Sequence, residues 1–141
     1  MPKKNTTGNK MYSELENLYA ACFPDKKQKW TANDFADLKK SGCDIIASQN
    51  SFIVWRTIAD EAEIISIGVA PIARRTGTAS ALMQIMENDA KQNGVKTIFL
   101  EVDELNIPAI SLYQKCGFTN AGIRPHYYDN GHNAIIMKKD I

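Results

Sequence analysis

The chain has 141 residues, 44% of them hydrophobic and 23% charged, which is typical of one globular domain with a single core. Its 17 Lys and Arg residues nearly balance its 16 Asp and Glu residues, and this lack of a basic excess argues against nucleic acid as the main partner. The apolar runs are much shorter than the ~20 residues of a membrane helix, and residues 1–10 contain no apolar segment for a secretory signal. We therefore expect a cytoplasmic protein that binds neither nucleic acid nor membrane.

The cysteine pattern indicates neither a disulfide framework nor a zinc site. Cys22, Cys43 and Cys116 are odd in number and widely spaced, and no Cys-x-x-Cys pair or histidine cluster accompanies them. We expect all three to be reduced and to have small packing roles, and we expect no metal.

The chain divides into a short tail and one domain. Residues 1–10 are polar and basic, a composition that buries little apolar surface, so they are expected to form a flexible tail. Residues 11–141 contain no linker rich in Pro, Gly or Ser and no internal repeat, so they are expected to form a single domain.

The first elements are expected to be two helices. Apolar residues at three- and four-residue spacing predict an amphipathic helix over residues 12–22, which Pro24 ends. Thr31 is suited to cap a second helix ending near Gly42, and Trp30 and Phe35 have the spacing of a hydrophobic staple around that cap.

The rest of the chain alternates strands and helices. Residues 44–49 and 51–59 predict a hairpin, residues 63–69 another strand, and the following long helix should end at Gly94. Further strands are predicted at residues 97–102, 121–127 and 133–138, and a further helix at residues 107–116. This order predicts an α/β fold with a mixed sheet, in which ligands favour the carboxyl ends of parallel strands.

The loop at residues 70–79 joins a strand to the long helix and is a candidate phosphate site. Arg74 and Arg75 supply positive charge, the residues after them are small, and the helix amino end offers unpaired N–H groups. The loop matches neither a Walker A sequence nor the three-glycine dinucleotide fingerprint, and taken alone such a loop is more often a simple connection.

Glu101 interrupts an apolar strand, where a carboxylate is costly to bury unless it is paired, solvated or used in chemistry. Strand alternation places Glu101 and Asp103 on one face and Leu100 and Val102 on the other. The alternative interpretation is that the strand ends there and Glu101 is a solvated rim residue.

Aromatic and histidine residues near the C-terminus have simpler structural interpretations. Tyr113 has helical spacing and, by periodicity alone, fits a core or boundary position, as do Tyr127 and Tyr128. His126 and His132 lie in a turn region rich in Gly and Asn and are expected to be exposed.

Together, these motifs resemble the GCN5-related N-acetyltransferase (GNAT) family, and more narrowly its RimI-type ribosomal-protein-alanine N-acetyltransferases. The resemblance spans about residues 11–141 and is densest from Asp60 onward. The matching segments are Val69-Ala70-Pro71, Arg74-x-x-Gly77-x-Ala79, Leu100-Glu101-Val102, Asn106, Leu112-Tyr113-x-x-x-Gly117-Phe118, Arg124 with Tyr127-Tyr128, and Ala134-Ile135-Ile136-Met137.

The resemblance implies a fold and a set of site residues. The fold is a mixed, mostly antiparallel central sheet with flanking helices and a splayed acetyl-CoA cleft. Glu101 is implied as the general base and Tyr113 as the general acid that protonates the leaving thiolate. The residues implied to bind acetyl-CoA are Ile67, Gly68 and Val69 in the strand, Arg74, Arg75, Thr76, Gly77, Thr78, Ala79 and Ser80 in the loop, and Asn106.

The implied reaction is acetyl transfer from acetyl-CoA to the N-terminal alanine of small-subunit ribosomal protein eighteen, with Glu101 acting directly or through water. Asp103 stands where many members have arginine, and His132 and Asn133 stand where acidic residues are common, so the acceptor pocket differs from the family pattern. Two alternatives remain open. One is a GNAT enzyme that acts on other N-termini, lysines or a small amine, and the other is a non-catalytic CoA-binding or protein-interaction module.

Overall fold

In this computed structural model, the backbone is described for residues 2–141 and the side chains for residues 10–141. The chain forms two compact units: unit 1 holds residues 1–54 and 66–82, and unit 2 holds residues 55–65 and 83–141. The flexible tail expected at residues 1–10 lies almost entirely outside the residues whose side chains are described. Its flexibility therefore stays a prediction.

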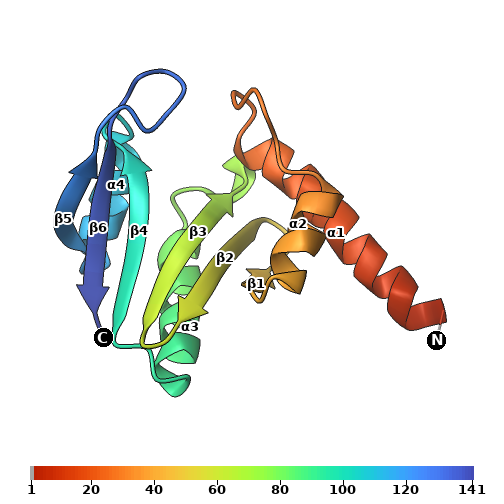
Figure 1. The fold of residues 1–141 in the computed structure, drawn as a ribbon. Coiled ribbons are helices and arrows are strands. Elements are labelled where there is room, and N and C mark those ends of the chain that lie inside the picture. The colour runs from red at the N-terminus through yellow and green to blue at the C-terminus, as the bar shows by residue number, and fades with distance from the viewer. Residues whose placement is uncertain (1) are drawn as a thin grey trace. The chain divides into compact units, whose positions relative to one another are not determined.

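Unit 1 is built around two helices and an aromatic core. Helix α1 (Pro2–Cys22) lies beside α2 (Ala32–Lys40), followed by β1 (Asp44–Ala47) (Figure 1). Helix α1 begins before the predicted start at residue 12. The aromatic core consists of Tyr19, Phe35 and Phe52, all at most 1% exposed.

The predicted start of α2 is confirmed. The Thr31 side chain accepts a hydrogen bond from the Asp34 backbone N–H, and the Asp34 carboxylate accepts one from the Thr31 N–H, which completes a capping box. The rings of Trp30 and Phe35 lie 5.4 Å apart, as a hydrophobic staple requires.

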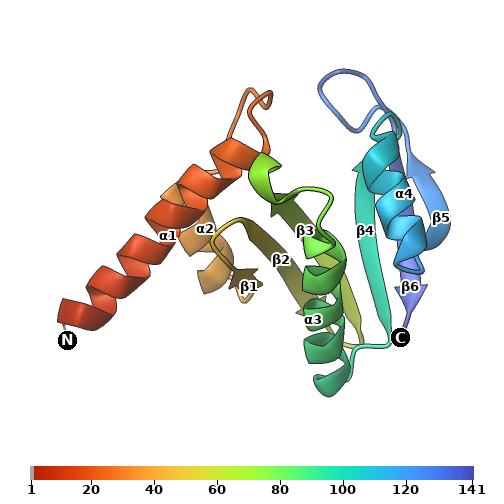
Figure 2. The same ribbon diagram turned by 180° about the vertical axis from the view of Figure 1, so that it is seen from behind.

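Unit 2 contains three adjacent strands and a helix. Strand β4 (Thr97–Asp103) pairs antiparallel with β6 (Ala134–Asp140), which pairs antiparallel with β5 (Thr119–Arg124). Helix α4 (Ile107–Lys115) lies along these strands, as the two opposite views show (Figures 1 and 2). Strand β5 ends at Arg124, earlier than predicted, because Pro125 has no N–H to continue the ladder.

The predicted mixed sheet is confirmed. The strands hydrogen-bond in the order β1-β2-β3-β4-β6-β5, where β2 spans Ser51–Ile58 and β3 spans Glu61–Val69. Strand β3 pairs in parallel with β4 at residues 61–63. Because the residues expected to line a splayed acetyl-CoA cleft belong to both units, that cleft stays a prediction.

The long helix α3 (Thr78–Gln92) ends as the sequence predicts. Gly94 has a φ of +82°, its N–H bonds to the Lys91 carbonyl, and the Val95 N–H bonds to the Ala90 carbonyl. Leu82, Met83, Met86 and Ala90 are buried along one face of the helix.

The three cysteines are free, and Cys22 and Cys43 are buried. Burial raises the pKa of the Cys22 thiol, and the positive charge of Arg74 partly opposes this shift. Within the described part of the chain, none of the helices is long and apolar enough to cross a bilayer.

Candidate active site

The loop between β3 and α3 is held in shape by Arg74. A short 3₁₀ turn, η1 (Pro71–Ala73), follows β3. The Arg74 guanidinium then reaches back, with Nε donating to the Val69 carbonyl at 3.1 Å and Nη2 donating to the Cys22 carbonyl at 2.9 Å. Arg74 therefore fixes the loop against the ends of β3 and α1, a positioning role that sequence reasoning did not predict.

The remainder of this loop has the backbone geometry of a small, open turn. Arg75 and Gly77 have φ values of +63° and +79°, and a Cβ placed on Gly77 would meet nothing within 4 Å. The Ala81 N–H donates to the Gly77 carbonyl at 3.0 Å, which marks the start of the α3 hydrogen-bond ladder. With exposed Arg75 beside it, this helix amino end suits a phosphate group.

Gly68 in β3 is required by packing within unit 1. A Cβ at this position would lie 2.5 Å from Cε1 of Phe52 and 3.0 Å from Sγ of Cys22. Its neighbours Ile67 and Val69 are half-buried. The strand predicted to contact the cofactor therefore packs its glycine directly on the aromatic core.

In unit 2, β4 alternates as predicted. Ile98, Leu100 and Val102 are buried on one face, whereas Glu101 and Asp103 are half-buried on the other. The two carboxylates therefore share one face, and each of them has a specific partner from the segment 124–132.

Glu101 is paired with Arg124 of β5. Oε1 of Glu101 lies 2.7 Å from Nη2 of Arg124, and the Glu101 side chain is 19% exposed. The guanidinium of Arg124 also lies over the Tyr127 ring, 5.3 Å from its centroid. Glu101 is thus a paired carboxylate, in agreement with one of the possibilities that the sequence left open.

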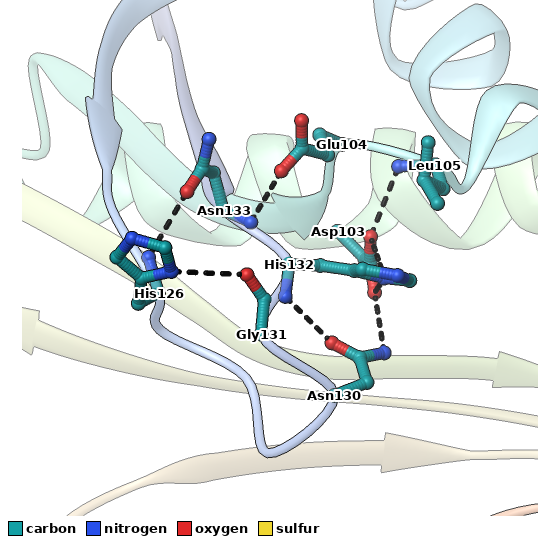
Figure 3. A network of polar contacts seen from close by, with 8 residues as sticks. All are labelled: Asp103, Glu104, Leu105, His126, Asn130, Gly131, His132 and Asn133. Atoms are coloured by element: carbon teal, nitrogen blue, oxygen red, sulfur yellow. Dashed lines mark hydrogen bonds and ion pairs between the residues drawn. The ribbon is translucent and has the colours of Figure 1, made fainter.

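Asp103 is held by the loop between β5 and β6. Nδ1 of His132 lies 2.9 Å from Oδ2 and 3.1 Å from Oδ1 of Asp103, and Asn130 Nδ2 donates to Oδ2 at 3.4 Å (Figure 3). The Leu105 N–H donates to Oδ1 at 2.9 Å. Burial acts to raise the pKa of Asp103, but these hydrogen bonds and the His132 charge outweigh it and hold the pKa below its usual value.

A second set of contacts closes the same loop. The Asn133 N–H donates to the Glu104 carboxylate, and Asn133 Oδ1 accepts from the His126 N–H (Figure 3). The Glu104 N–H donates to the Asn133 carbonyl. His126 is exposed, as predicted, whereas the expectation of an exposed His132 is wrong. His132 is half-buried because the carboxylate of Asp103 holds its ring.

Tyr113 is buried in α4, as its spacing predicts. Its ring packs against Phe118 at 6.2 Å, and burial, with a smaller contribution from Cys116, raises the pKa of Tyr113 to about 12. The phenol therefore keeps its proton throughout the neutral range.

Tyr128 lies among the same residues, which sequence reasoning did not predict. The pKa of Tyr128 is raised to about 12. Burial is the largest cause, the negative charges of Asp103 and Glu101 come next, and Tyr127 and Tyr113 make smaller contributions. The Tyr127-Tyr128 pair belongs to the segments that resemble the GNAT family, but no local sequence pattern shows that Tyr128 lies near the carboxylates of β4.

Asn106 caps α4. Its Oδ1 accepts from the Ala109 N–H at 3.3 Å. This role orients the start of the helix that carries Tyr113, and the expected contact of Asn106 with CoA stays a prediction.

The comparisons with known proteins all point to one family of acetyltransferases. Residues 12–118 match the family model described as the acetyltransferase (GNAT) family. The [ribosomal protein bS18]-alanine N-acetyltransferase of Escherichia coli K12 is 38% identical over 90 residues, which cover 62% of this chain and 61% of that protein. The protein of the same name from Salmonella typhimurium is 34% identical over 124 residues, which cover 84% of this chain and 82% of the relative.

The fold agrees with these relatives. The crystal structure of the ribosomal-protein-S18-alanine N-acetyltransferase from Escherichia coli superposes with a TM-score of 0.80 and 28% identity, covering 92% of this chain and 87% of that chain.

Proposed function

Because the chain belongs to the GNAT acetyltransferase family, we propose that it transfers the acetyl group of acetyl-CoA to the N-terminal alanine of ribosomal protein bS18. The observation that carries this proposal is the similarity to the bS18-alanine N-acetyltransferase of Salmonella typhimurium over 84% of the chain. A ribosomal-protein acceptor also favours a cytoplasmic location.

The residues of unit 1 fit the CoA part of this proposal. A pyrophosphate needs backbone N–H groups, open space and positive charge. The Gly77 turn at the start of α3 offers the open space, and exposed Arg75 offers the charge. In this proposal, the backbone of residues 75–80 holds the pyrophosphate, with Thr76, Thr78, Ala79 and Ser80 among the contacts, and Ile67, Gly68 and Val69 pair with the pantetheine arm.

The residues of unit 2 fit the proton transfers. Acetyl-CoA supplies the acetyl group as a thioester, so the protein must accept a proton from the amine and donate one to sulfur. Glu101 accepts the amine proton, directly or through water. Tyr113 donates its phenolic hydrogen to the leaving thiolate, and the phenol is fully protonated at neutral pH.

The proposal is tested with a peptide of the bS18 N-terminus. The wild-type chain should release CoA thiol with a peptide that begins with alanine, and not with the same peptide after N-terminal blocking. A peptide panel that differs only in the first residue separates this enzyme from one acting on other N-termini. Failure to release thiol with any amine would favour the non-catalytic alternative.

A further inference from the structure

His132 and Asp103 form a histidine–carboxylate pair in unit 2. Nδ1 of His132 lies 2.9 Å from Oδ2 and 3.1 Å from Oδ1 of Asp103 (Figure 3). A carboxylate that is ionised at neutral pH accepts hydrogen bonds and donates none, so Nδ1 must carry the hydrogen. The neutral ring therefore has its free lone pair on Nε2, which makes His132 a base with a fixed orientation.

The main chain of the loop also holds His132 in place. The His132 N–H donates to Oδ1 of Asn130 at 2.9 Å, and the His132 carbonyl accepts from the Tyr128 N–H at 3.3 Å. The His132 side chain is 33% exposed. The ring is thus fixed at Nδ1 and still reaches solvent, so it can take up a proton in the site and release it again.

Within the part of the chain that the structure describes, Asp103 is the titratable group that contacts the His132 ring. The carboxylate of the next residue, Glu104, accepts a hydrogen bond from the Asn133 N–H. His126 is exposed, and its N–H donates to the Asn133 side chain. A proton on the His132 ring therefore acts first on the pair with Asp103.

The pair lies beside the carboxylate that is proposed to receive the amine. Glu101 and Asp103 share one face of β4 and are two residues apart, which is roughly 7 Å along a strand. The Tyr128 phenol interacts with both carboxylates. Glu101, Asp103 and the ring that Asp103 holds therefore belong to one site.

The proposed reaction needs two proton acceptors. An α-amino group with a pKa near 7.8 is about 86% protonated at pH 7. This ammonium must lose one proton before its nitrogen can attack the thioester, and the nitrogen loses a second proton after the attack. Tyr113 supplies a proton to the sulfur, so Glu101 is the one acceptor assigned so far, and a second acceptor is needed.

We propose that His132 accepts, at Nε2 and either directly or through one water, the proton that the ammonium loses before the attack. The inference rests on the proposed function. The N–H bond of the ammonium breaks, its electron pair stays on nitrogen, and the proton binds to Nε2. The negative charge of Asp103 stabilises the imidazolium, which then releases the proton to solvent. Glu101 takes the second proton once the bond between nitrogen and the acetyl carbon has formed.

The test replaces His132 with Asn, whose Nδ2 takes the place of Nδ1 and keeps a donor for Asp103, but which has no basic nitrogen. This variant can use only the neutral amine, about 14% of the total at pH 7. With a peptide that begins with alanine, we expect kcat/KM to fall about sevenfold at pH 7, the inverse of that fraction. At pH 9, where about 94% of the amine is neutral, the variant should equal the wild type within about 10%.

Two further measurements separate proton transfer from a structural role. His126→Asn, the same change at an exposed histidine of the same loop, should leave kcat/KM unchanged at both pH values. Imidazole added to His132→Ala at pH 7 should restore kcat/KM, because it supplies the missing base, and should not raise the activity of the wild type.

The wild type gives a check that needs no variant. Its kcat/KM should decrease between pH 9 and pH 7 by less than the roughly sevenfold decrease in neutral amine. An equal loss in His132→Asn at both pH values, no loss at pH 7, or no response of His132→Ala to imidazole would each overturn the inference. Absence of acetyl transfer by the wild type would instead overturn the proposed function.

Discussion

Arg124 pairs with Glu101 although the sheet register places it in line with Asp103. Arg124 and Asp103 both lie opposite Ala134 of β6, whereas Glu101 lies opposite Ile136. Asp103 is already held by His132, so the guanidinium reaches diagonally to the next carboxylate on the same face. Gly122, opposite Ile136 on β5, has no side chain to obstruct that path.

Glu101→Gln should lower turnover strongly while CoA affinity stays unchanged. The amide keeps the shape of the side chain but cannot accept the amine proton, so we expect kcat to fall by roughly 10²–10⁴-fold. Steady-state kinetics and CoA titration measure the two effects. Glu63→Gln is a matched control, because it also breaks a glutamate–arginine pair, with exposed Arg56. If Glu101→Gln and Glu63→Gln have equal activity, Glu101 is a structural carboxylate.

Gly77→Asp should weaken CoA binding. The new side chain has open space around it, so the fold should survive, but its negative charge would lie beside the proposed pyrophosphate site. We expect CoA affinity to fall by at least about tenfold, which is about 1.4 kcal/mol, as measured by calorimetry.

Two controls separate charge from backbone strain in that experiment. Gly77→Ala has the same unfavourable φ of +79° without the charge. Gly94→Asp adds the same charge at a glycine with a φ of +82° and equally open surroundings, but at the other end of α3. Equal CoA affinities for Gly77→Asp and Gly94→Asp would remove the phosphate site from this loop.

The parts of the site that could be predicted from sequence are local. Turn chemistry marks the loop around Gly77, and strand alternation correctly places Glu101 and Asp103 on one face of β4. The capping box at Thr31 depends on residues three apart in the chain, so it too is visible in sequence.

The parts that could not be predicted depend on pairing between distant strands. The Glu101–Arg124 contact joins residues 23 positions apart and follows from the register of β4, β6 and β5. The Asp103–His132 contact joins residues 29 positions apart. Opposite charges in the sequence do not show which acid pairs with which base. The Gly- and Asn-rich turn around His132 predicts exposure, because this local pattern does not show the contact with Asp103.

Asp103→Asn should destabilise the protein at neutral pH but not in acid. The pKa of Asp103 is lowered in the folded protein, so its stabilising contribution is present above its ordinary pKa of 3.8 and is lost as pH falls through the lowered value. The substitution removes the negative charge that accepts hydrogen bonds from His132 and the Leu105 N–H, so the free energy of unfolding should fall by about 1–2 kcal/mol at pH 7. Thermal melts at pH 7 and below pH 3 measure the change.

Asp129→Asn is the control for Asp103→Asn, because Asp129 is an exposed acid in the same loop. The melting temperature of this control should follow that of the wild type at both pH values. A deficit of Asp103→Asn that is equally large at pH 7 and below pH 3 would show that the charge of Asp103 does not contribute.

Tyr113→Phe should slow the chemical step while the fold is retained. The phenylalanine ring keeps the packing against Phe118, but the hydrogen that protonates the leaving sulfur is gone. We expect a decrease of roughly ten- to ten-thousandfold in single-turnover rate. Full activity of Tyr113→Phe would exclude this phenol as the proton donor.

The pH behaviour of Tyr113 gives an independent check on that role. Its pKa of about 12 means that the phenol stays protonated well above pH 10, so wild-type turnover should show no loss from this ionisation below about pH 11. In an absorbance titration at the tyrosinate band, Tyr113→Phe and Tyr128→Phe should each remove one late-ionising phenol. Because the folded pKa is raised, the contribution of each phenol to stability is complete below its ordinary pKa of 10 and is lost as pH rises through about 12. A turnover limb that falls near pH 10 and vanishes in Tyr113→Phe would mean that the phenol is more exposed than its place in α4 indicates.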